Sequence, residues 1–471
     1  MQNESLEMVM PTAIICLSHG VYIRNVLYSP LYEELSKKFN LVLVLPGGTK
    51  VPEEYKKILR GARLVIADFE NHKFEKIFLF LRKNVFAGRE RTQSFNIISE
   101  IERKKHPIIY PIASLLNSFF GRFFFISCWW QKCESFFING AEFFPLILEV
   151  KPAIVITANY GTEGLEIRLL RAAHANGIPT FSIVPSWDNL SSKGVIGEKP
   201  RKLAVWNKIM AQEASALYGF HPEDVRAVGG LQFDRYAQEI SSEASREVLK
   251  SLGLNLTDPY IVIGTITPNY FPHNLEIIDM LIMAILEGRL PADLQILVRL
   301  HPQVVGDPVY GDDLEAYRAR AAKYSFLKLS IPIVYDWGVI RPPAADDVNQ
   351  LAVILSNAAA AIMPASTLAL DSCVLGCPII GIGFDGFETK PYEKSVRRTF
   401  DFTHYRRIVL EGGIRIAESH SQLLEEILSY LNNRERDRPG REKTISSHLY
   451  YRDGKAWQRI LEMIYEITSQ R

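Results

Sequence analysis

The sequence has few cysteines and no strong excess of either charge. Its five cysteines are an odd number, and neither of their two short spacings is backed by a second Cys or His pair. This argues against a disulfide framework and against a structural zinc site. Reduced thiols are typical of cytosolic proteins, so we expect a cytoplasmic location. The formal net charge of +1 gives no support for nucleic acid as a partner.

Long apolar runs are also missing. The first ten residues contain two glutamates and no basic start followed by an apolar stretch, so we expect no secretory signal there. Residues 107–130 are rich in Phe, Ile and Trp, but Asn117, Arg122 and two prolines interrupt them. A spanning helix needs about 20 predominantly apolar residues, and we therefore predict no span.

Two interpretations of residues 107–130 stay open: a pair of buried helices, or an apolar surface that contacts a lipid or the inner face of a membrane. Residues 72–86, just upstream, combine a Phe and Leu stripe with lysines and an arginine. That composition is typical of a helix at a membrane interface, and equally of a domain helix with a solvated basic face.

The chain length of 471 residues exceeds one hydrophobic core and indicates two or three domains. In the first part, short apolar runs alternate with amphipathic stretches. The apolar runs occupy 12–18, 41–46, 62–68, 153–159 and 180–184. Apolar strands separated by helices predict a parallel sheet covered on both faces, which is a doubly wound α/β domain.

The same alternation resumes after residue 200. We expect strands at 202–207, 225–230, 260–265, 294–300, 332–336, 360–364 and 378–383. The sequence therefore predicts a first Rossmann-like domain over 1–198, a second over 199–440, and a C-terminal helix within 441–471 that packs back on the first. Two such domains across a cleft suit a ligand held at the carboxyl ends of both sets of strands.

A His-Pro pair follows the strand expected at 294–300. The imidazole of His301 can donate to a phosphate or a hydroxyl, and Pro302 restricts the backbone that follows. Arg299, two residues earlier, shares a face of the strand with His301. A single His-Pro pair is common, so the pair by itself is weak evidence for a binding site.

Hydroxyl side chains follow two other strands of the second domain. Ser366 and Thr367 stand at the start of an expected helix, where they satisfy free N–H groups or help to bind an anion. Thr265 and Thr267 follow the strand at 260–265. They either lie near the phosphates of a ligand or belong to a polar turn that Pro268 begins.

Taken together, the His-Pro and Ser-Thr pairs resemble those of bacterial glycosyltransferases with the two-domain GT-B fold. The most similar group includes teichoic-acid (CDP-glycerol) glycerophosphotransferases, capsule polysaccharide transferases and bacterial sialyltransferases. The pairs match in type, order and strand-to-loop context, and the resemblance covers most of 200–465. The first half of the chain matches only in architecture.

The resemblance implies that both pairs grip a nucleotide donor of the CMP, CDP or UDP type. It also implies a metal-independent reaction, and the chain has no Asp-X-Asp motif after an expected strand. We therefore predict no metal and no cofactor other than the nucleotide-sugar co-substrate.

The stretch PSWDNLSSKG, residues 185–194, leaves the strand at 180–184 on the side expected to face the donor. Group transfer needs a base for the proton of the acceptor hydroxyl. Asp188 is the first candidate, followed by His19 and Glu163, which come after two other strands. Arg24, soon after His19, is expected in the cleft.

The other residues of this stretch have two interpretations. Trp187 would form a stacking wall for a sugar ring, Asn189 would orient the substrate, and Lys193 would offset developing phosphate charge. Alternatively, the stretch is a turn stabilised by its Asp side chain, with Trp187 buried as a plug at the hinge between the domains.

The sequence thus predicts a glycosyltransferase that moves a sugar, or a sugar-like phosphate unit, from a nucleotide to a hydroxyl, and the resemblance implies that the reaction is inverting. The acceptor would be a surface glycan or a lipid-linked glycan. A UDP-N-acetylhexosamine 2-epimerase and a catalytically silent nucleotide-binding protein are the alternatives.

Overall fold

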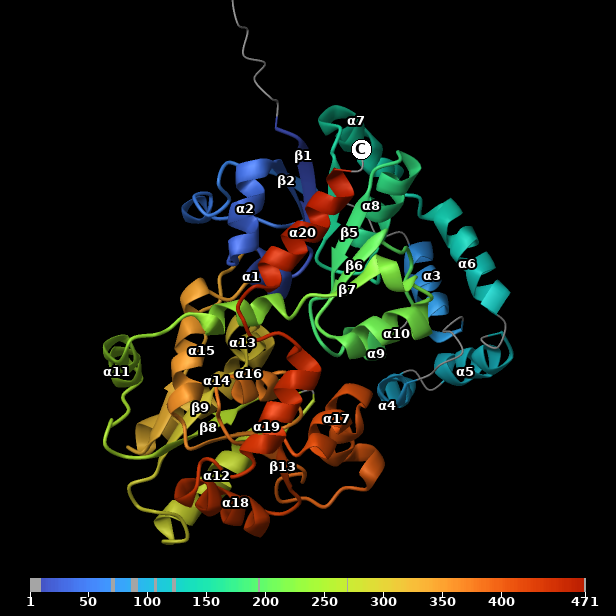
Figure 1. The fold of residues 1–471 in the computed structure, drawn as a ribbon. Helices are drawn as coiled ribbons and strands as arrows, with labels where there is room; N and C mark the ends of the chain where they lie inside the picture. Colours follow the sequence, from blue (N-terminus) through green and yellow to red (C-terminus); the bar gives the residue numbers. More distant parts are fainter. Residues whose placement is uncertain are drawn as a thin grey trace, which may run out of the picture.

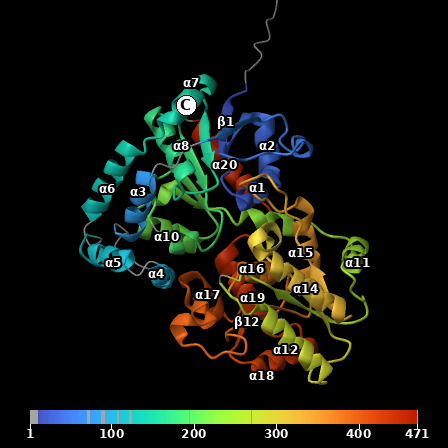
Figure 2. The same ribbon diagram turned by 180° about the vertical axis from the view of Figure 1, so that it is seen from behind.

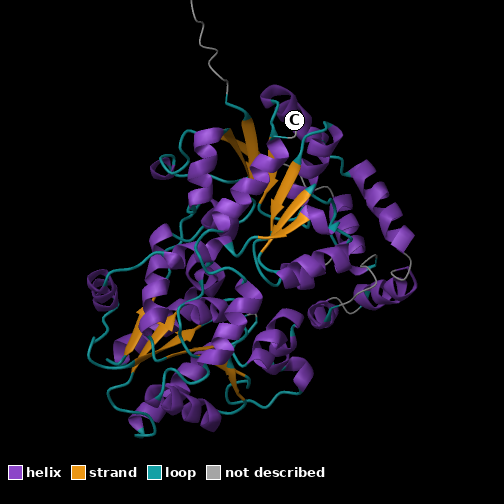
Figure 3. Cartoon of the chain, viewed as in Figure 1, coloured by secondary structure: helices purple, strands orange, loops and turns teal. Residues whose placement is uncertain are grey.

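The computed structural model describes residues 10–68, 73–85, 92–105, 108–120, 124–193, 195–268 and 270–469. The chain forms two α/β domains, each built on its own parallel sheet (Figures 1 and 3). The central strands of both sheets are almost completely buried, because helices cover both faces of each sheet.

The first sheet has seven parallel strands in the order β3-β2-β1-β4-β5-β6-β7. Its strands are β1 (Thr12–Cys16), β2 (Asn40–Pro46), β3 (Arg63–Ala67), β4 (Ile154–Thr157), β5 (Thr180–Ile183), β6 (Lys202–Val205) and β7 (Val225–Ala227). Its main helices are α1 (Gly20–Leu27), α2 (Pro30–Lys38), α7 (Phe144–Val150), α8 (Gly164–Ala175) and α10 (Lys208–Tyr218). Gly219 ends α10 with a φ of 64°, a left-handed conformation that glycine adopts without strain.

The second sheet has six parallel strands in the order β10-β9-β8-β11-β12-β13. Its strands are β8 (Tyr260–Gly264), β9 (Gln295–Arg299), β10 (Leu327–Ser330), β11 (Ala360–Met363), β12 (Ile379–Ile382) and β13 (Arg415–Ala417). Its main helices are α11 (Ser242–Ser251), α12 (Asn274–Leu286), α14 (Gly311–Lys323), α15 (Ala345–Asn357), α16 (Leu368–Val374), α17 (Thr403–Glu411) and α18 (His420–Asn432). When its strands are numbered from one in chain order, the second sheet has the order 3-2-1-4-5-6, which is that of the Rossmann fold. The predicted pair of doubly wound domains is confirmed.

Two strands were assigned to the wrong domain. Residues 202–205 and 225–227 were expected in the second domain, but β6 pairs with β5 and β7 pairs with β6 in the first sheet. Leu203, Ala204 and Val205 are buried there. An apolar run reveals that a strand forms but not which sheet edge it joins, because either edge would bury it equally well.

The strand expected at 332–336 is also absent. Only Val334 forms a bridge, with Pro343, and the third strand of the second sheet is β10 instead. Residues 333–344 form a loop that reaches the first domain, where the Trp337 carbonyl accepts a hydrogen bond from Lys50 N at 2.8 Å. Trp337 is buried among first-domain residues, so the apolar character of this segment serves an interdomain contact.

The chain crosses between the domains twice. The first crossing includes the 3-10 helix η4 (Leu231–Ala237), and the second precedes α20 (Ala456–Thr468). Asp234 of η4 accepts hydrogen bonds from the backbone N–H of Ala456 and Trp457, at 3.0 and 2.8 Å. Helix α20 packs into the first-domain core (Figure 1), as predicted for the C-terminal helix. Helix α19 (Arg438–Thr444), just before it, packs on the second domain.

Between β3 and α7, the sequence forms the helices α3 (Lys73–Asn84), α4 (Gln93–Lys105), α5 (Ile109–Phe120) and α6 (Phe124–Phe137). In Figure 2 they lie on the opposite side of the first domain from α1 and α2. Within the described ranges, no helix has both the length and the apolarity for a membrane span. The interpretation of 107–130 as buried helices is wrong for α5, because its apolar side chains are largely exposed. Residues 107 and 121–123 lie outside the described residues.

Candidate active-site cleft between the two domains

A cleft of about 1440 Å³ separates the two domains and is lined by residues of both. Its first wall includes Ser18, His19 and Arg24, after β1. Its second wall includes Thr265 after β8, His301 after β9, and the residues that follow β11. In both sheets the chain order reverses beside the first strand, between β1 and β4 and between β8 and β11. The carboxyl ends of the strands at such a reversal are where open α/β sheets bind ligands.

His301 stands at the N-terminus of a short helix, α13 (Pro302–Gly306). The ring Nδ1 accepts a hydrogen bond from Gln303 N at 3.2 Å, and the backbone N–H of His301 donates to Thr265 Oγ1 at 2.9 Å. Burial lowers the pKa of His301 to about 4, so the ring is neutral at pH 7. Because Nδ1 accepts, the single ring hydrogen resides on Nε2, which makes this side chain a donor with one available N–H.

His19 repeats this arrangement on the opposite wall. Its Nδ1 accepts from Val21 N at 3.3 Å, and burial lowers its pKa. The neutral ring again holds its hydrogen on Nε2. The next residue is Gly20, where a Cβ would lie 2.5 Å from the carbonyl oxygen of Arg341 in the second domain. Glycine therefore permits the close approach of the two walls at this point.

The other predicted donor-site residues differ in position. Ser366, Thr367 and Pro302 line the cleft, and Ser366 Oγ accepts from Leu368 N at 3.3 Å. Arg299 also lines it, but its guanidinium forms an ion pair with Asp347 and donates to Ser330 at 2.9 Å. Its charge is therefore already paired. Thr267 is buried and does not line the cleft.

The residues of the PSWDNLSSKG stretch do not line the cleft as a group. Pro185 and Ser186 do, whereas Trp187, Asp188, Asn189 and Lys193 do not. Trp187 is buried against α17, with its ring 4.7 Å from His404 and 5.7 Å from Tyr405 between centroids. This is the packing expected of a plug at the hinge between the domains.

Asp188 lies in a network of its own. It accepts hydrogen bonds from Ser186 and from Ser192 at 3.0 Å, and from Asn189 at 3.4 Å. Burial alone would raise its pKa, but nearby His404 and these hydrogen bonds outweigh burial and lower it. The carboxylate thus stabilises the turn in which it lies.

Glu163 reaches the cleft indirectly. Its carboxylate accepts from Tyr22 at 3.3 Å and from Ser18 at 3.4 Å, and Ser18 lines the cleft. Ser18 also hydrogen-bonds to Glu166, one turn further along α8. Glu166 was not identified from the sequence. The sequence does contain a sign of it: two glutamates three residues apart follow an apolar strand, and this spacing places both on one face of a helix.

Glu166 is completely buried. Burial and the neighbouring Glu163 raise its pKa to about 8, from an ordinary value of 4.5. Between pH 5 and 8 the folded protein therefore holds a proton that the unfolded chain has lost, and the free energy of unfolding falls as pH rises.

We expect the Glu166→Gln variant to lack this dependence. Relative to the variant, the wild type should lose about 1 kcal/mol of stability per pH unit between pH 5 and 8. Urea unfolding at several pH values measures the difference. The exposed Glu223→Gln serves as the control and should follow the wild type. Parallel profiles for wild type and Glu166→Gln would contradict the assignment.

A carboxyl group that does line the cleft, Asp371, was also not identified from the sequence. Asp371 of α16 lines the cleft, and burial raises its pKa to about 6. It accepts a hydrogen bond from Tyr236 at 2.9 Å, and the positive charge of Arg24 acts on it from the first domain. Arg24 itself donates to Gln232 at 2.8 Å. Nothing in the sequence links residues 24, 236 and 371, because only the closure of two domains brings them together.

Among the side chains that the structure describes, no group of three or more His, Cys, Asp or Glu residues could hold a metal ion. The cleft's own aspartates have other partners, such as Arg299 for Asp347 and backbone N–H groups for Asp234. A metal-independent reaction stays a prediction.

No protein-family model matches the chain, and no curated protein matches it in sequence. Solved structures do match in fold. A UDP-GlcNAc 2-epimerase from Neisseria meningitidis bound to UDP-GlcNAc shares 11% identity, with 97% of this chain and 100% of that chain covered and a TM-score of 0.55. A glycosyltransferase from Rickettsia africae shares 10% identity, with 98% and 100% covered and a TM-score of 0.53.

These similarities concern the fold, since the identities are low. Both neighbours align over nearly the whole chain, both domains included. Two facing Rossmann-like domains with a C-terminal helix that returns to the first domain form the GT-B fold, and this chain adopts it. The fold class predicted from the sequence is thereby confirmed, and the reaction has to be argued from the cleft.

Proposed function

We propose that the protein is a glycosyltransferase that transfers a sugar from a nucleotide to a hydroxyl of a glycan acceptor, with inversion and without a metal. The observation that carries this proposal is a cleft between two Rossmann-like domains, lined on one side by His301 and Ser366 and on the other by His19 and Ser18. The second domain would bind the donor and the first would bind the acceptor.

The donor side offers neutral hydrogen-bond donors, beside the paired guanidinium of Arg299. The Nε2–H of His301 and the hydroxyl of Ser366 can both donate to phosphate oxygens. A hydrogen bond to a charged group contributes about 1.5 to 3 kcal/mol. Arg299 would act by holding β9 and the His301 loop in place through Asp347.

The volume of the cleft favours two substrates. Pockets for one small ligand measure about 300 to 1000 Å³, whereas this cleft measures about 1440 Å³. A nucleotide sugar would leave space for part of an acceptor. Closure around both would exclude water and so protect the donor from hydrolysis.

For the base we favour Glu163 among the three predicted candidates, because Ser18 links it to the cleft. The acceptor oxygen would form its bond to the anomeric carbon as the bond to the donor phosphate breaks, and the nucleotide would leave with that electron pair. The acceptor proton would pass to Ser18 while the Ser18 hydrogen passes to Glu163. Turnover that survives in Glu163→Gln but is lost in Asp188→Asn would transfer the role to Asp188.

The donor site is tested by thermal shift with CMP, CDP, UDP, GDP and dTDP. A ligand at 100 times its dissociation constant adds about 2.7 kcal/mol to stability. We expect His301→Ala and Ser366→Ala to reduce the shift of the best nucleotide, because each removes a donor to its phosphates. The exposed His221→Ala is the matched control and should keep the full shift. An intact shift in both cleft variants would show that the donor site is elsewhere.

An epimerase is the second candidate, since the structure from Neisseria meningitidis that shares this fold is a UDP-GlcNAc 2-epimerase. Asp371, whose pKa burial raises to about 6, is compatible with proton exchange at a sugar carbon. Incubation with UDP-GlcNAc in deuterated water separates the two. Deuterium at C2 without an acceptor favours the epimerase, and nucleotide release that requires an acceptor favours the transferase. Nucleotide binding with neither outcome would indicate a silent binding protein.

A further inference from the structure

Three helices of the first domain turn large apolar side chains toward solvent. The side chains that are between 52% and 78% exposed are Ile77 of α3, Ile109, Ile112, Leu115 and Phe119 of α5, and Trp129, Phe136 and Phe137 of α6. We call these eight residues the apolar helix surface. On α5 the spacing of three to four residues places them on one face. Large apolar side chains gathered on the exposed faces of neighbouring helices are typical of an interaction site.

Among the described side chains of the same helices, several that are buried are polar or charged. Helix α5 buries Ala113 and Asn117, and α6 buries Glu134. Glu134 Oε1 lies 2.8 Å from Nη1 of Arg82 on α3, and 3.3 Å from Nη2 of Arg171 on α8. A helix on a water-exposed surface normally has the reverse arrangement, with the apolar face inward. Ions inside and Ile, Leu and Phe outside suit helices whose outer face meets an apolar medium.

The charge of this region differs from that of the rest of the chain. Residues 71–137 contain eleven Lys and Arg against five Glu and no Asp, a net charge of +6. The whole chain has +1, so the remaining residues carry −5. Lys76 and Lys132 are exposed on the same helices. The apolar helix surface therefore lies within the positive part of an otherwise negative molecule, which favours an anionic surface.

From these observations we propose that α3, α5 and α6 bind the protein to an anionic membrane. The helices would lie in the plane of the interface, with the apolar helix surface at the boundary of headgroups and acyl chains. Helices of 12 to 14 residues are too short to cross a bilayer. A symmetric dimer through the same surface is disfavoured, because it would bring two segments of charge +6 together. The proposal does not depend on the reaction that the cleft performs.

Flotation with vesicles tests the proposal. The full chain should float with vesicles of phosphatidylcholine and phosphatidylglycerol, bind those of pure phosphatidylcholine more weakly, and lose affinity as salt is raised. Replacing two aliphatic side chains in Ile112→Ser/Leu115→Ser should lower the partition coefficient at least about tenfold, because both are buried in the interface. Leu410→Ser is the matched control, since Leu410 is equally exposed but lies on α17 of the second domain.

Three outcomes would overturn the proposal. These are failure of the wild type to float with anionic vesicles, flotation that the double variant retains, and a concentration-dependent dimer without lipid that the double variant abolishes. A charge variant, Lys76→Glu/Lys132→Glu, leaves the apolar side chains in place and should reduce binding only to the anionic vesicles. Equal melting temperatures of all variants without lipid verify that each one folds.

Discussion

The Glu134→Gln variant is expected to lose about 3 to 5 kcal/mol of stability, the range typical of breaking a buried ion pair. Glu134 is fully buried, and both Arg82 and Arg171 point to its Oε1. Without the carboxylate, two guanidinium groups would remain in the same buried space. Arg171 keeps a partner in Glu198 at 3.3 Å. Among the residues that the structure describes, Arg82 would retain only the carbonyl oxygen of Thr162 at 3.1 Å.

Urea unfolding followed by circular dichroism measures this loss. The matched control is Glu149→Gln, which removes the exposed ion pair with Arg63. Exposed pairs contribute about 0 to 1 kcal/mol, so the control should unfold almost as the wild type does. Equal losses in the two variants would mean that the Glu134 cluster is hydrated and not a buried ionic core. The interpretation that α3 and α6 bury ionic groups and expose apolar side chains would then lose its main support.

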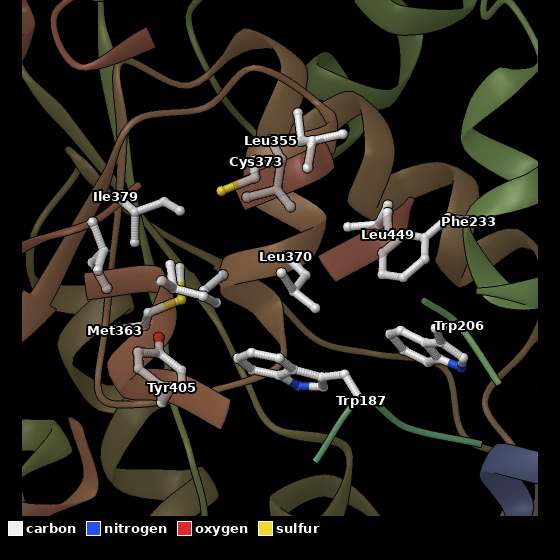
Figure 4. Packing of buried hydrophobic residues seen from close by; sticks show 14 of the residues in the cluster. Trp187, Trp206, Phe233, Leu355, Met363, Leu370, Cys373, Ile379, Tyr405 and Leu449 are labelled. Atoms are coloured by element: carbon white, nitrogen blue, oxygen red, sulfur yellow. The ribbon is translucent and has the colours of Figure 1, made fainter. Parts of the chain in front are cut away.

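The Trp187→Ala variant is expected to be destabilised by about 3 to 5 kcal/mol, because it leaves a cavity the size of an indole ring. Trp187 comes from the first domain but packs against second-domain residues, including Tyr405 and Leu370 (Figure 4). Its ring also lies 5.5 Å from that of His448. The cluster around it contains residues of both domains, so its removal should weaken the coupling between them.

Calorimetry distinguishes this coupling from a local defect. We expect the two domains of Trp187→Ala to unfold in two separate transitions. Nucleotide binding should also weaken, because the two walls of the cleft are no longer held in a fixed relative position. Trp129→Ala is the matched control: its indole is exposed on α6, and in the absence of lipid its loss should change stability by less than about 0.5 kcal/mol. A single transition at the wild-type temperature in Trp187→Ala would contradict the role of the plug.

Much of the fold was predictable because fully apolar runs that alternate with amphipathic stretches are typical of a parallel sheet covered by helices. The runs at 12–18, 41–46 and 62–68 became β1, β2 and β3, at close to the expected lengths. Sheet membership was not predictable for β6 and β7, since their burial is satisfied by any free edge. Residues 332–336 were wrongly predicted as a strand, because this apolar segment belongs to a loop that contacts the other domain.

The candidate site divides in a similar way. His301 and Ser366 were identified because each comes within three residues of the end of a strand, and the carboxyl end of a strand in a parallel sheet faces the cleft. Trp187 and Asp188 also follow a strand, yet neither lines the cleft. Trp187 turns into the domain contact, and Asp188 bonds within its own turn. A residue's distance from the strand end sets where its backbone lies, but packing of the partner domain decides which way the side chain turns.

The sequence by itself determined that this protein has two parallel-sheet domains, a returning C-terminal helix, and a histidine and hydroxyl side chains at the strand ends of the second domain. Periodicity is a local property, so it can be recognised within a few residues. Only the tertiary structure decided that Arg24 faces Asp371, that Glu134 holds two arginines together and that α5 exposes its apolar face. These relations depend on which surfaces meet after folding, and residues far apart in the chain carry no local sign of their partner.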